Sequence, residues 1–380
     1  MKSSRKILHI ITTLSSGGAE GMLYKLISHS SKNALLKHSV VSLTDMGIYG
    51  MRLRDLGVPV YCLDMLHGNL GFEGIAKLYL LLKKYKPHIL HTWLYHADLI
   101  GLIIGRLLKV PRILWNVRCS NVDFKYYAKT TRLIFSVLSR LSRFPDVVVI
   151  NSEAGKLFHI KSGYNPRKWE LIPNGFDIER YKPNREIRAG FRKSLGLGKS
   201  DSIIGMVARY DPMKDYSNFF EAAGRLSMVF PKLNFVIAGR GMNKTNYDVM
   251  KMIQQHGLNE NTFLLGERDD LPEIIPSFDI GTLTSSFGEG FPNVLGEYML
   301  CGVPSVSTDV GDSANIIGDA GIIVPPNNPE ALAKAWLDLL GMTPEQRTEL
   351  GLKARQRIVD KFSISKVVEK YEKLYLGMLK

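Results

Sequence analysis

Two carboxylates, Glu289 and Glu297, stand eight positions apart in a stretch that is rich in glycine and leads into an apolar segment. Gly288 and Gly290 allow the backbone to approach a bound molecule closely, and Pro292 suits the first turn of a helix. Free N–H groups at a helix start attract anions and hydroxyl oxygens. Glu297, about one turn inside that helix, can accept the two hydroxyl hydrogen bonds of a ribose diol, and Glu289 can bind a second polyol. The spacing therefore predicts a sugar-nucleotide site, against the alternative of an ordinary helix start with a surface glutamate.

Two cations follow another predicted strand, residues 203–208. Arg209 comes directly after the strand, and Lys214 lies five positions later across a turn that contains proline. A planar guanidinium and a compact ammonium can both bind one diphosphate. Taken alone, they would more often be solvated cations at a turn. Because both cations and both carboxylates, Glu289 and Glu297, follow strands of the same half, we predict one site for all four.

The first half of the chain offers weaker candidates. Gly17 and Gly18 follow the first predicted strand and open a helix, where a glycine turn offers N–H groups to a phosphate or an acceptor. This turn lacks the GxGxxG spacing, which disfavours a nicotinamide site, and a purely structural turn is the alternative. His96 follows the fourth strand, and Asp98 is expected to cap the next helix. We expect His96 to face a cleft as a neutral partner for a hydroxyl or phosphate, or to be a structural histidine.

Other common kinds of site are disfavoured. No carboxylate or histidine pair has the spacing of metal ligands, and Asp269 with Asp270 is expected to be a solvated turn. Cys62, Cys119 and Cys301 are odd in number and widely spaced, so we expect no disulfide framework and a reducing cytosol. The first apolar run is short and interrupted by a histidine, which predicts a strand rather than a signal peptide. No run reaches the 18 apolar residues that a membrane span requires.

Short β-branched runs alternate with helical patterns along the whole chain, which indicates the α/β class with two doubly wound parallel sheets. The predicted strands are 7–12, 39–43, 58–63, 89–91, 113–116 and 147–151 in the first half, and 203–208, 234–238, 262–265, 280–284, 305–307 and 322–324 in the second. Helices are predicted at 19–29, 75–84 and 99–108.

Pro173 and the following Asn-Gly separate the two series, which predicts domains 1–173 and 174–362. A basic helix at 363–380 is expected to pack back across the boundary. The cleft between the two lobes should be lined by loops that follow the strands.

The formal net charge of +14 is unevenly distributed. Residues 1–173 contain 25 Lys and Arg against 10 Asp and Glu, whereas residues 174–380 contain 25 against 26. A basic first half predicts an anionic partner: a phosphorylated substrate, the inner membrane leaflet or nucleic acid, unless the charge serves solubility alone. Segment 123–144 interleaves aliphatic and aromatic residues with Lys and Arg, which fits either an interfacial amphipathic helix or a helix packed on the sheet. No nucleic-acid motif accompanies the charge, so we expect no nucleic-acid partner.

Taken together, these motifs resemble the retaining glycosyltransferases of family 4, which have the GT-B fold of two facing Rossmann-like lobes with a central cleft. The resemblance covers most of the chain, and its E-x7-E spacing is that of Glu289 and Glu297. The matching pieces, in chain order, are Gly17-Gly-Ala-Glu20, Leu171-Ile-Pro-Asn-Gly-Phe-Asp177, Arg209 with Lys214, Glu289 to Glu297, and Thr308-Asp-Val-Gly311.

The resemblance implies a role for each donor-site residue. Arg209 and Lys214 would hold the donor diphosphate, Glu297 the ribose, and Glu289 the donor sugar. The remaining donor-binding residues would be Gly18, Arg268, Gly290, Phe291, Pro292 and Asn293, where Gly290 and Phe291 act through their amides and Gly18 approaches the phosphate from the other lobe.

The resemblance also implies a mechanism. Arg209, Lys214 and Glu289 would be the catalytic set. Transfer would retain the anomeric configuration by front-face attack, with the departing diphosphate taking the acceptor proton. The main catalytic effect would be electrostatic stabilisation of the leaving group, with no metal and no other cofactor.

One departure concerns the acceptor side. Several relatives carry a histidine after the fifth strand, whereas this chain has Asn116-Val-Arg118-Cys-Ser-Asn121 there. Arg118 is therefore a candidate contact for an acceptor phosphate or sugar, together with Gly17 and His96.

The segments 91–96 and 309–313 look most like bacterial members that build O-antigen, capsule or related surface glycans on a polyprenyl-diphosphate carrier. The resemblance thus implies a UDP-sugar donor, a lipid-linked saccharide acceptor, and a cytoplasmic enzyme held peripherally on the inner face of the membrane. The alternatives are a soluble member of the same fold that acts on a small metabolite or sugar phosphate, a basic nucleic-acid-binding module, and a catalytically silent sugar-binding relative.

Overall fold

The computed structural model describes residues 4–15, 17–65, 71–118, 120, 129–198, 200–230 and 232–379. The chain forms two compact units. The first comprises Met1–Gly175 together with Ile364–Lys380, and the second comprises Phe176–Ser363. The predicted boundary after residue 173 lies two residues before the observed one. The C-terminal segment returns to the first unit at Ile364, one residue after its predicted start.

The first unit is built on a seven-stranded sheet in which every pairing is parallel, in the order β3-β2-β1-β4-β5-β6-β7. Its strands are β1 (Arg5–Ile11), β2 (Leu36–Ser42), β3 (Val60–Cys62), β4 (Ile89–Trp93), β5 (Arg112–Val117), β6 (Val147–Ile150) and β7 (Trp169–Leu171). The strand order reverses between β1 and β4, which is where ligands bind in sheets of this kind.

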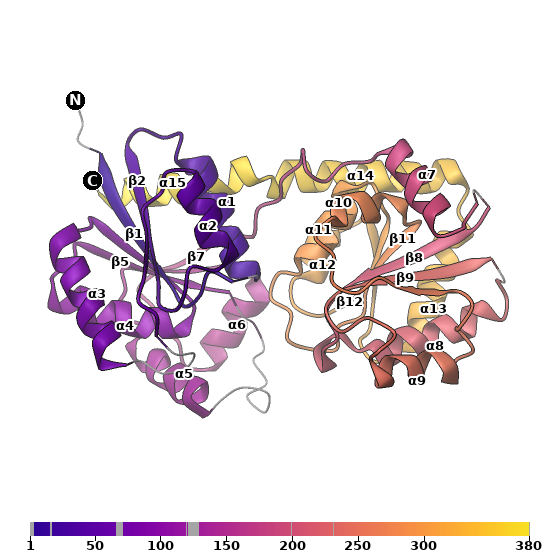
Figure 1. The fold of residues 1–380 in the computed structure, drawn as a ribbon, viewed down its shortest axis with the longest axis horizontal. Coiled ribbons are helices and arrows are strands. Elements are labelled where there is room, and N and C mark those ends of the chain that lie inside the picture. Colours follow the sequence, from indigo (N-terminus) through magenta and orange to yellow (C-terminus); the bar gives the residue numbers. More distant parts are fainter. Residues whose placement is uncertain are drawn as a thin grey trace. The chain divides into compact units, whose positions relative to one another are not determined.

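Helices cover both faces of this sheet (Figure 1). They are α1 (Gly18–Ser30), α2 (Gly47–Asp55), α3 (Phe72–Tyr85), α4 (Tyr95–Leu107), α5 (Lys129–Leu141), α6 (Glu153–Lys161) and α15 (Ile364–Gly377). Successive residues of β1 point to opposite faces. Ile7 packs in a core with Leu23 of α1 and Val367 of α15, whereas Leu8 packs in the other core with residues of α3, α4 and α5. The C-terminal helix therefore completes the core of the first unit.

The second unit repeats this plan on a six-stranded parallel sheet in the order β10-β9-β8-β11-β12-β13. Its strands are β8 (Ser202–Val207), β9 (Leu233–Ala238), β10 (Thr262–Leu264), β11 (Ile280–Leu283), β12 (Ser305–Thr308) and β13 (Gly321–Val324). Its helices are α7 (Arg185–Ser194), η2 (Pro212–Lys214), α8 (Tyr216–Ser227), α9 (Tyr247–Gln255), α10 (Leu271–Ile274), η3 (Ile275–Ser277), α11 (Asn293–Leu300), α12 (Ser313–Ile317), α13 (Pro329–Leu340) and α14 (Pro344–Phe362). Here the order reverses between β8 and β11.

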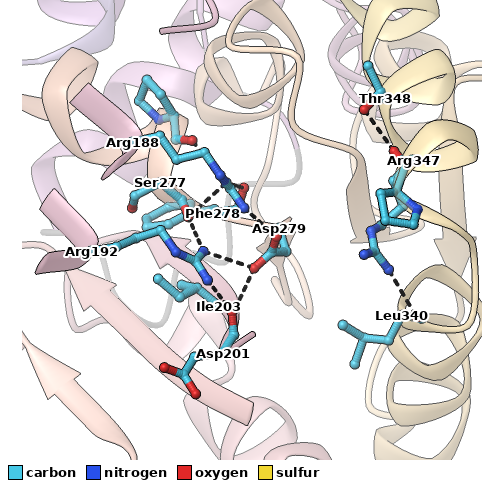
Figure 2. A network of polar contacts seen from close by, with 12 residues as sticks. Arg188, Arg192, Asp201, Ile203, Ser277, Phe278, Asp279, Leu340, Arg347 and Thr348 are labelled. Atoms are coloured by element: carbon cyan, nitrogen blue, oxygen red, sulfur yellow. Dashed lines mark hydrogen bonds and ion pairs between the residues drawn. The ribbon is translucent and has the colours of Figure 1, made fainter. Parts of the chain in front are cut away.

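Two arginines of α7 fix the entry to β11 (Figure 2). Arg188 donates to Asp279 Oδ1 at 2.5 Å and to the Phe278 carbonyl at 2.8 Å, and Arg192 lies 3.1 Å from Asp279 Oδ2. The Ile203 amide also donates to Asp279 Oδ2, at 2.8 Å. One carboxylate thus ties α7 to the amino ends of the two central strands.

Each predicted strand and helix is present, with ends shifted by at most a few residues. Some details differ. The short edge strand β7 and the helices α2 and α6 of the first unit have no counterpart in the prediction. Asp98 does not cap α4, because the helix begins at Tyr95 after Leu94, which has a left-handed φ of 74°. Asp98 instead lies buried in the first turn and accepts a hydrogen bond from the Thr92 hydroxyl.

Candidate functional site

The strongest candidates from the sequence gather at the switch point of the second sheet. Arg209 and Lys214 follow β8, and Glu289 follows β11, the neighbouring strand. Because parallel strands end at one edge of the sheet, the two connecting loops meet there. The Ser286 amide donates to the Met213 carbonyl at 2.9 Å, which joins the two loops directly.

Lys214 and Glu289 form a buried ion pair at this point. Their side chains are 12% and 9% exposed, and Lys214 Nζ contacts Glu289 Oε1. Ser285 donates its hydroxyl to the same oxygen at 2.6 Å. The Thr284 hydroxyl holds the Lys214 carbonyl at 2.7 Å, so both members of the pair are positioned by the end of β11. The sequence predicted a site for both residues but gave no sign that they would be each other's partner.

Arg209 is held at the rim of the same site by Asp211. Its Nε lies 2.9 Å and one terminal nitrogen 2.8 Å from Asp211 Oδ2, and the Arg209 side chain is 48% exposed. The other oxygen of Asp211 accepts the Met213 amide at 3.0 Å and caps η2, which carries Lys214. One carboxylate therefore fixes both the guanidinium and the turn that presents the ammonium.

The loop that carries Glu289 is fixed by close backbone packing. Gly288 adopts a left-handed φ of 79°, a conformation that glycine reaches without strain. Gly311 has φ of 63°, and a Cβ there would lie only 2.5 Å from the Glu289 carbonyl oxygen. The Asp312 amide donates to the Gly290 carbonyl at 2.9 Å. The turn after β12 thus supports the loop after β11, which accounts for the glycine in Thr308-Asp-Val-Gly311.

Helix α11 begins beside this loop. Pro292 occupies the N-cap position, one residue earlier than predicted, and Asn293 is the first helical residue. The Phe291 side chain is buried, with its ring centroid 5.4 Å from that of Phe362, so only its main chain can meet a ligand. Glu297 lies one turn inside the helix, as predicted.

Arg268 lies apart from this group in the sheet order. It follows the edge strand β10, two strands away from β8. Its Nε donates to Asp270 Oδ1 at 2.7 Å, and this pairing lowers the pKa of the Asp270 carboxyl. The predicted turn at Asp269 and Asp270 therefore contains an ion pair with Arg268.

The glycine turn of the first unit lies at the N-terminus of α1, after β1. Gly17 occupies the N-cap position in an extended conformation and Gly18 is the first helical residue. A Cβ on Gly17 would lie 2.2 Å from a carboxylate oxygen of Glu20, so a larger residue there would have to displace the end of that side chain. Glu20 is itself buried, and burial raises the pKa of its carboxyl. The sequence gave no indication that a carboxyl group would lie over this turn.

His96 lies at the second position of α4, at the switch point of the first sheet. It is partly buried, and its Nε2 is enclosed without a hydrogen-bond partner within the described residues. Burial lowers the pKa of its imidazole, so the ring is neutral near pH 7 and can donate to or accept from a hydroxyl group.

Arg118 already has several partners within the first unit. It donates to the Tyr371 hydroxyl at 2.6 Å and to the side-chain oxygen of Asn174, and its guanidinium lies 4.8 Å from the centroid of the Trp93 ring. Burial lowers the pKa of Arg118. These contacts attach the loop after β5 to α15, and an acceptor role for Arg118 stays a prediction.

Behind Arg118 lies a buried polar network that the sequence did not reveal. His9 Nε2 and His38 Nδ1 are 3.0 Å apart, and His91 Nδ1 lies 2.8 Å from the Tyr375 hydroxyl. The histidines come from three different strands, at positions that are spread along the sequence. Only the parallel register, which pairs His9 with His91, places them together.

The predicted amphipathic segment 123–144 is described only in part, because residues 121–128, like Cys119, lie outside the described residues. Helix α5 packs on α4 through buried Phe135 and Leu138, while Leu133 is exposed. Where it is described, the segment is thus a helix packed on the sheet.

Among the described residues, no helix has the length and apolar character needed to cross a membrane. In the same part of the chain, no three His, Cys, Asp or Glu side chains gather as metal ligands would.

Comparison with known proteins finds a family match in each half of the chain. Residues 16–180 match the family model described as Glycosyltransferase Family 4, and residues 188–357 match the model described as Glycosyl transferases group 1. The chain is 28% identical over 320 residues to the Escherichia coli UDP-Gal:alpha-D-GlcNAc-diphosphoundecaprenol alpha-1,3-galactosyltransferase, covering 81% of this chain and 80% of that protein. It is 24% identical to the N-acetyl-alpha-D-glucosaminyl L-malate synthase of Bacillus anthracis over 53% of this chain and 56% of that protein.

Among solved structures, Anabaena HepE in complex with UDP superposes with a TM-score of 0.84 at 20% identity, covering 98% of this chain and all of that one. The sucrose-phosphate synthase of Thermosynechococcus elongatus superposes with a TM-score of 0.80 at 17% identity, over 99% of both chains. At these identities the likeness shows the fold. Two Rossmann-like sheets, a family match in each half and a glycosyltransferase related over most of the chain lead to one conclusion: this chain belongs to the GT-B glycosyltransferases of family 4.

Proposed function

We propose that this glycosyltransferase moves a hexosyl or N-acetylhexosaminyl group from a UDP-sugar to a polyprenyl-diphosphate-linked saccharide, with retention of the anomeric configuration, in surface glycan biosynthesis. The observation that carries the proposal is the grouping of Arg209, Lys214 and Glu289 at the switch point of the second sheet, with Glu297 on the adjoining helix α11. Two cations, two carboxylates and a helix start are the groups that a diphosphate, a ribose and a sugar require.

In the proposed reaction the bond between the anomeric carbon and the diphosphate oxygen breaks, and a bond from the acceptor hydroxyl oxygen to that carbon forms on the same face. The acceptor proton passes to the departing diphosphate, so UDP leaves with the charge that Arg209 and Lys214 stabilise. Electrostatic stabilisation of a leaving group by preorganised cations is commonly worth about 10²–10³ in rate per group. The step uses neither a metal ion nor another cofactor.

Glu289 has two roles in this proposal. It orients hydroxyls of the donor sugar, and its pairing keeps Lys214 in place before donor binds. Ser285 and Lys214 both contact Glu289 Oε1, so the end of β11 and η2 together fix this carboxylate. The main-chain groups of Gly290 and Phe291 complete the contact.

The donor and acceptor classes rest on relatives. The Escherichia coli relative is named for transfer from UDP-Gal to a diphosphoundecaprenol-linked sugar. A lipid-linked acceptor also suits the basic first unit, since anionic lipid attracts basic surfaces. On that unit several large apolar side chains are exposed on the helices that cover one face of the sheet, namely Phe72, Leu80, Ile103, Leu107 and Leu133. We therefore place the enzyme peripherally on the cytoplasmic leaflet, with these helices toward the lipid.

The test is transfer from a panel of UDP-sugars and GDP-mannose, with EDTA present, to polyprenyl-diphosphate-linked monosaccharide in detergent. Lipid product together with released UDP is the expected result, and NMR of the product gives the anomeric configuration. Nucleotide release without lipid product would move the acceptor to the small-metabolite class. Folded protein that neither transfers sugar nor binds UDP would overturn the proposal.

Membrane binding is tested separately by sedimentation with anionic and neutral liposomes at low and high salt. The proposal expects binding to anionic liposomes that weakens with salt. No sedimentation at low salt would support an enzyme that acts on a small metabolite or sugar phosphate.

A further inference from the structure

We infer that Asp211 is a positioning residue for the donor site: it holds one edge of the Arg209 guanidinium and leaves the other edge for the donor diphosphate. The inference rests on the proposed function and deepens it by adding a residue that acts through Arg209. Both oxygens of the Asp211 carboxylate have defined partners, and each oxygen has a different task.

Asp211 Oδ2 binds the guanidinium from the side. It accepts a hydrogen bond from Arg209 Nε at 2.9 Å and lies 2.8 Å from Nη2. Nε and Nη2 share one edge of the planar guanidinium, whereas Nη1 and Nη2 share the edge at its end. Within the described residues, Nη1 has no hydrogen-bond or ion-pair partner, and Nη2 has only the Met213 sulfur, at 3.7 Å, besides Asp211. The end edge, which can bind two phosphate oxygens side by side, therefore remains available.

Asp211 Oδ1 fixes the turn that follows. It accepts a hydrogen bond from the Met213 amide at 3.0 Å and caps η2, and the Lys214 amide donates to the Asp211 carbonyl at 2.9 Å. The Met213 carbonyl in turn accepts from the Ser286 amide at 2.9 Å. Because both carboxylate oxygens are in use at once, the carboxylate cannot rotate without breaking a hydrogen bond.

The backbone that carries Arg209 is fixed on both sides. The Ala208 amide donates to the Ala238 carbonyl at 2.9 Å, and the Tyr210 amide donates to the Arg240 carbonyl at 2.8 Å. What remains free to move is the long side chain of Arg209, which is 48% exposed. The carboxylate two positions later is the charged group that restrains it.

This restraint matters for binding and for catalysis. A half-exposed arginine samples many rotamers, and a ligand that binds it must order them at a cost in affinity. Because Asp211 orders Arg209 before the donor arrives, part of that cost is met during folding. The guanidinium then has a fixed place when negative charge moves onto the departing diphosphate.

The competing hypothesis is that Asp211 blocks the diphosphate by neutralising Arg209. The use of the two edges favours positioning, because a phosphate on the end edge requires no displacement of the carboxylate from the side edge. Competition would require both anions to bind the same pair of nitrogens.

The test uses two substitutions that divide the tasks of Asp211. Asparagine caps helices as well as aspartate does, so Asp211→Asn should keep the bond to the Met213 amide. Its NH₂ group would face the guanidinium as donor against donor, so it cannot hold Arg209. Asp211→Ala removes both tasks. Thermal unfolding checks that both variants are folded.

Calorimetric titration with UDP and with uridine measures binding. Asp211→Asn should bind UDP about fivefold more weakly, which is the effect of ordering one released side chain. Uridine lacks the diphosphate, so its affinity should be the same in the variant and the unaltered enzyme. In the transfer assay, kcat should fall by about tenfold or more, because the contact from Arg209 strengthens as the leaving group gains charge.

Two further variants complete the test. Arg209→Ala combined with Asp211→Asn should bind UDP as Arg209→Ala alone does, since Asp211 acts through that guanidinium. Glu221→Gln is the matched control, because it also removes one negative charge from an exposed ion pair, that with Arg225, in the same unit. It should leave UDP affinity and kcat unchanged.

Three results would overturn the inference and leave the proposed function standing. Unaltered UDP affinity and kcat in Asp211→Asn, beside an impaired Asp211→Ala, would make Asp211 a cap only. Tighter UDP binding by Asp211→Asn would make it a competitor of the diphosphate. A loss that persisted in the Arg209→Ala background would mean that Asp211 does not act through Arg209. If the folded, unaltered enzyme bound no UDP, the proposed function would fail and this inference with it.

Discussion

Lys214 and Glu289 come from loops 75 positions apart, and they meet in a buried ion pair at the switch point of the second sheet. Before any donor binds, the ammonium proposed to hold the diphosphate already has a counter-charge. Burying an unpaired ammonium at this depth would be strongly unfavourable. The pairing with Glu289 offsets that cost, so Lys214 can lie buried at the place where the diphosphate is proposed to bind.

Removing either member of this pair should reduce both stability and transfer. Lys214→Ala leaves Glu289 buried without its counter-charge, which predicts a loss of about 3 kcal/mol in the free energy of unfolding. Transfer should fall by about 10²–10³ because the leaving group loses a cation. Urea unfolding and initial rates measure the two effects.

The double variant Lys214→Ala with Glu289→Ala separates the two effects. It removes both charges, so stability should partly recover while activity stays lost. If activity recovered together with stability, the pair would be structural only.

Arg209 should behave differently, because its side chain is about half exposed and its partner Asp211 lies at the surface. Exposed ion pairs contribute about 0–1 kcal/mol, so Arg209→Ala should leave stability nearly unchanged. Transfer should still fall by about 10²–10³. Arg225→Ala, which removes another exposed ion pair in the same unit, is the control and should retain full activity. Full activity in Arg209→Ala would exclude Arg209 from the site.

The sequence was sufficient for the fold because both sheets are built from short, buried β-branched strands that alternate with helices, and this pattern is local. It also predicted that Arg209, Lys214 and Glu289 would lie together, since each lies in a loop that follows a central strand and parallel strands end at one edge. Their grouping needed no knowledge of any contact, and their role in donor binding stays a prediction.

What the sequence could not provide are contacts that depend on three-dimensional register. Lys214 lies 75 positions before Glu289, and no local pattern shows that the two form an ion pair. The Asp98 prediction was wrong because it assumed an ordinary cap before the helix. The helix instead begins after Leu94, which adopts a left-handed φ that residues other than glycine rarely adopt. The polar network around His9 likewise requires the register between three strands.

That network predicts acid sensitivity of the first unit. Burial lowers the pKa of His38 from 6.5 to about 4 and lowers those of His9 and His91 as well. Between about pH 6.5 and pH 4 the unfolded chain therefore binds more protons than the folded one. The contribution of these neutral histidines to the free energy of unfolding is fully present above pH 6.5 and is lost as the pH falls toward 4. For His38 alone the loss is about 3 kcal/mol.

The groups that face these histidines are Ser30, Trp93, Asn116, Arg118, Tyr371 and Tyr375, and Ser30 in turn donates to Glu372. Urea unfolding at several pH values, followed by tryptophan fluorescence, measures the effect because three of the four tryptophans lie in the first unit. In His38→Gln, the pH dependence of the free energy of unfolding should correspond to about one proton fewer. An unchanged slope in that variant would contradict the assignment.

Asp279 should be important for stability and unimportant for nucleotide binding. Its carboxylate pairs with Arg188 and Arg192, and the Arg192 side chain is only 7% exposed (Figure 2). Asp279→Ala leaves a buried guanidinium without its counter-charge, which predicts a loss of about 3 kcal/mol in the free energy of unfolding. The comparison is Asp338→Ala, which removes an exposed partner of Lys334 and should change stability by less than about 0.5 kcal/mol.

Since Asp279 precedes β11 and the candidate site follows it, folded Asp279→Ala protein should bind UDP with unaltered affinity. Weaker UDP binding by folded protein would mean that the two ends of the strand are coupled, and that α7 supports the donor site as well as the fold.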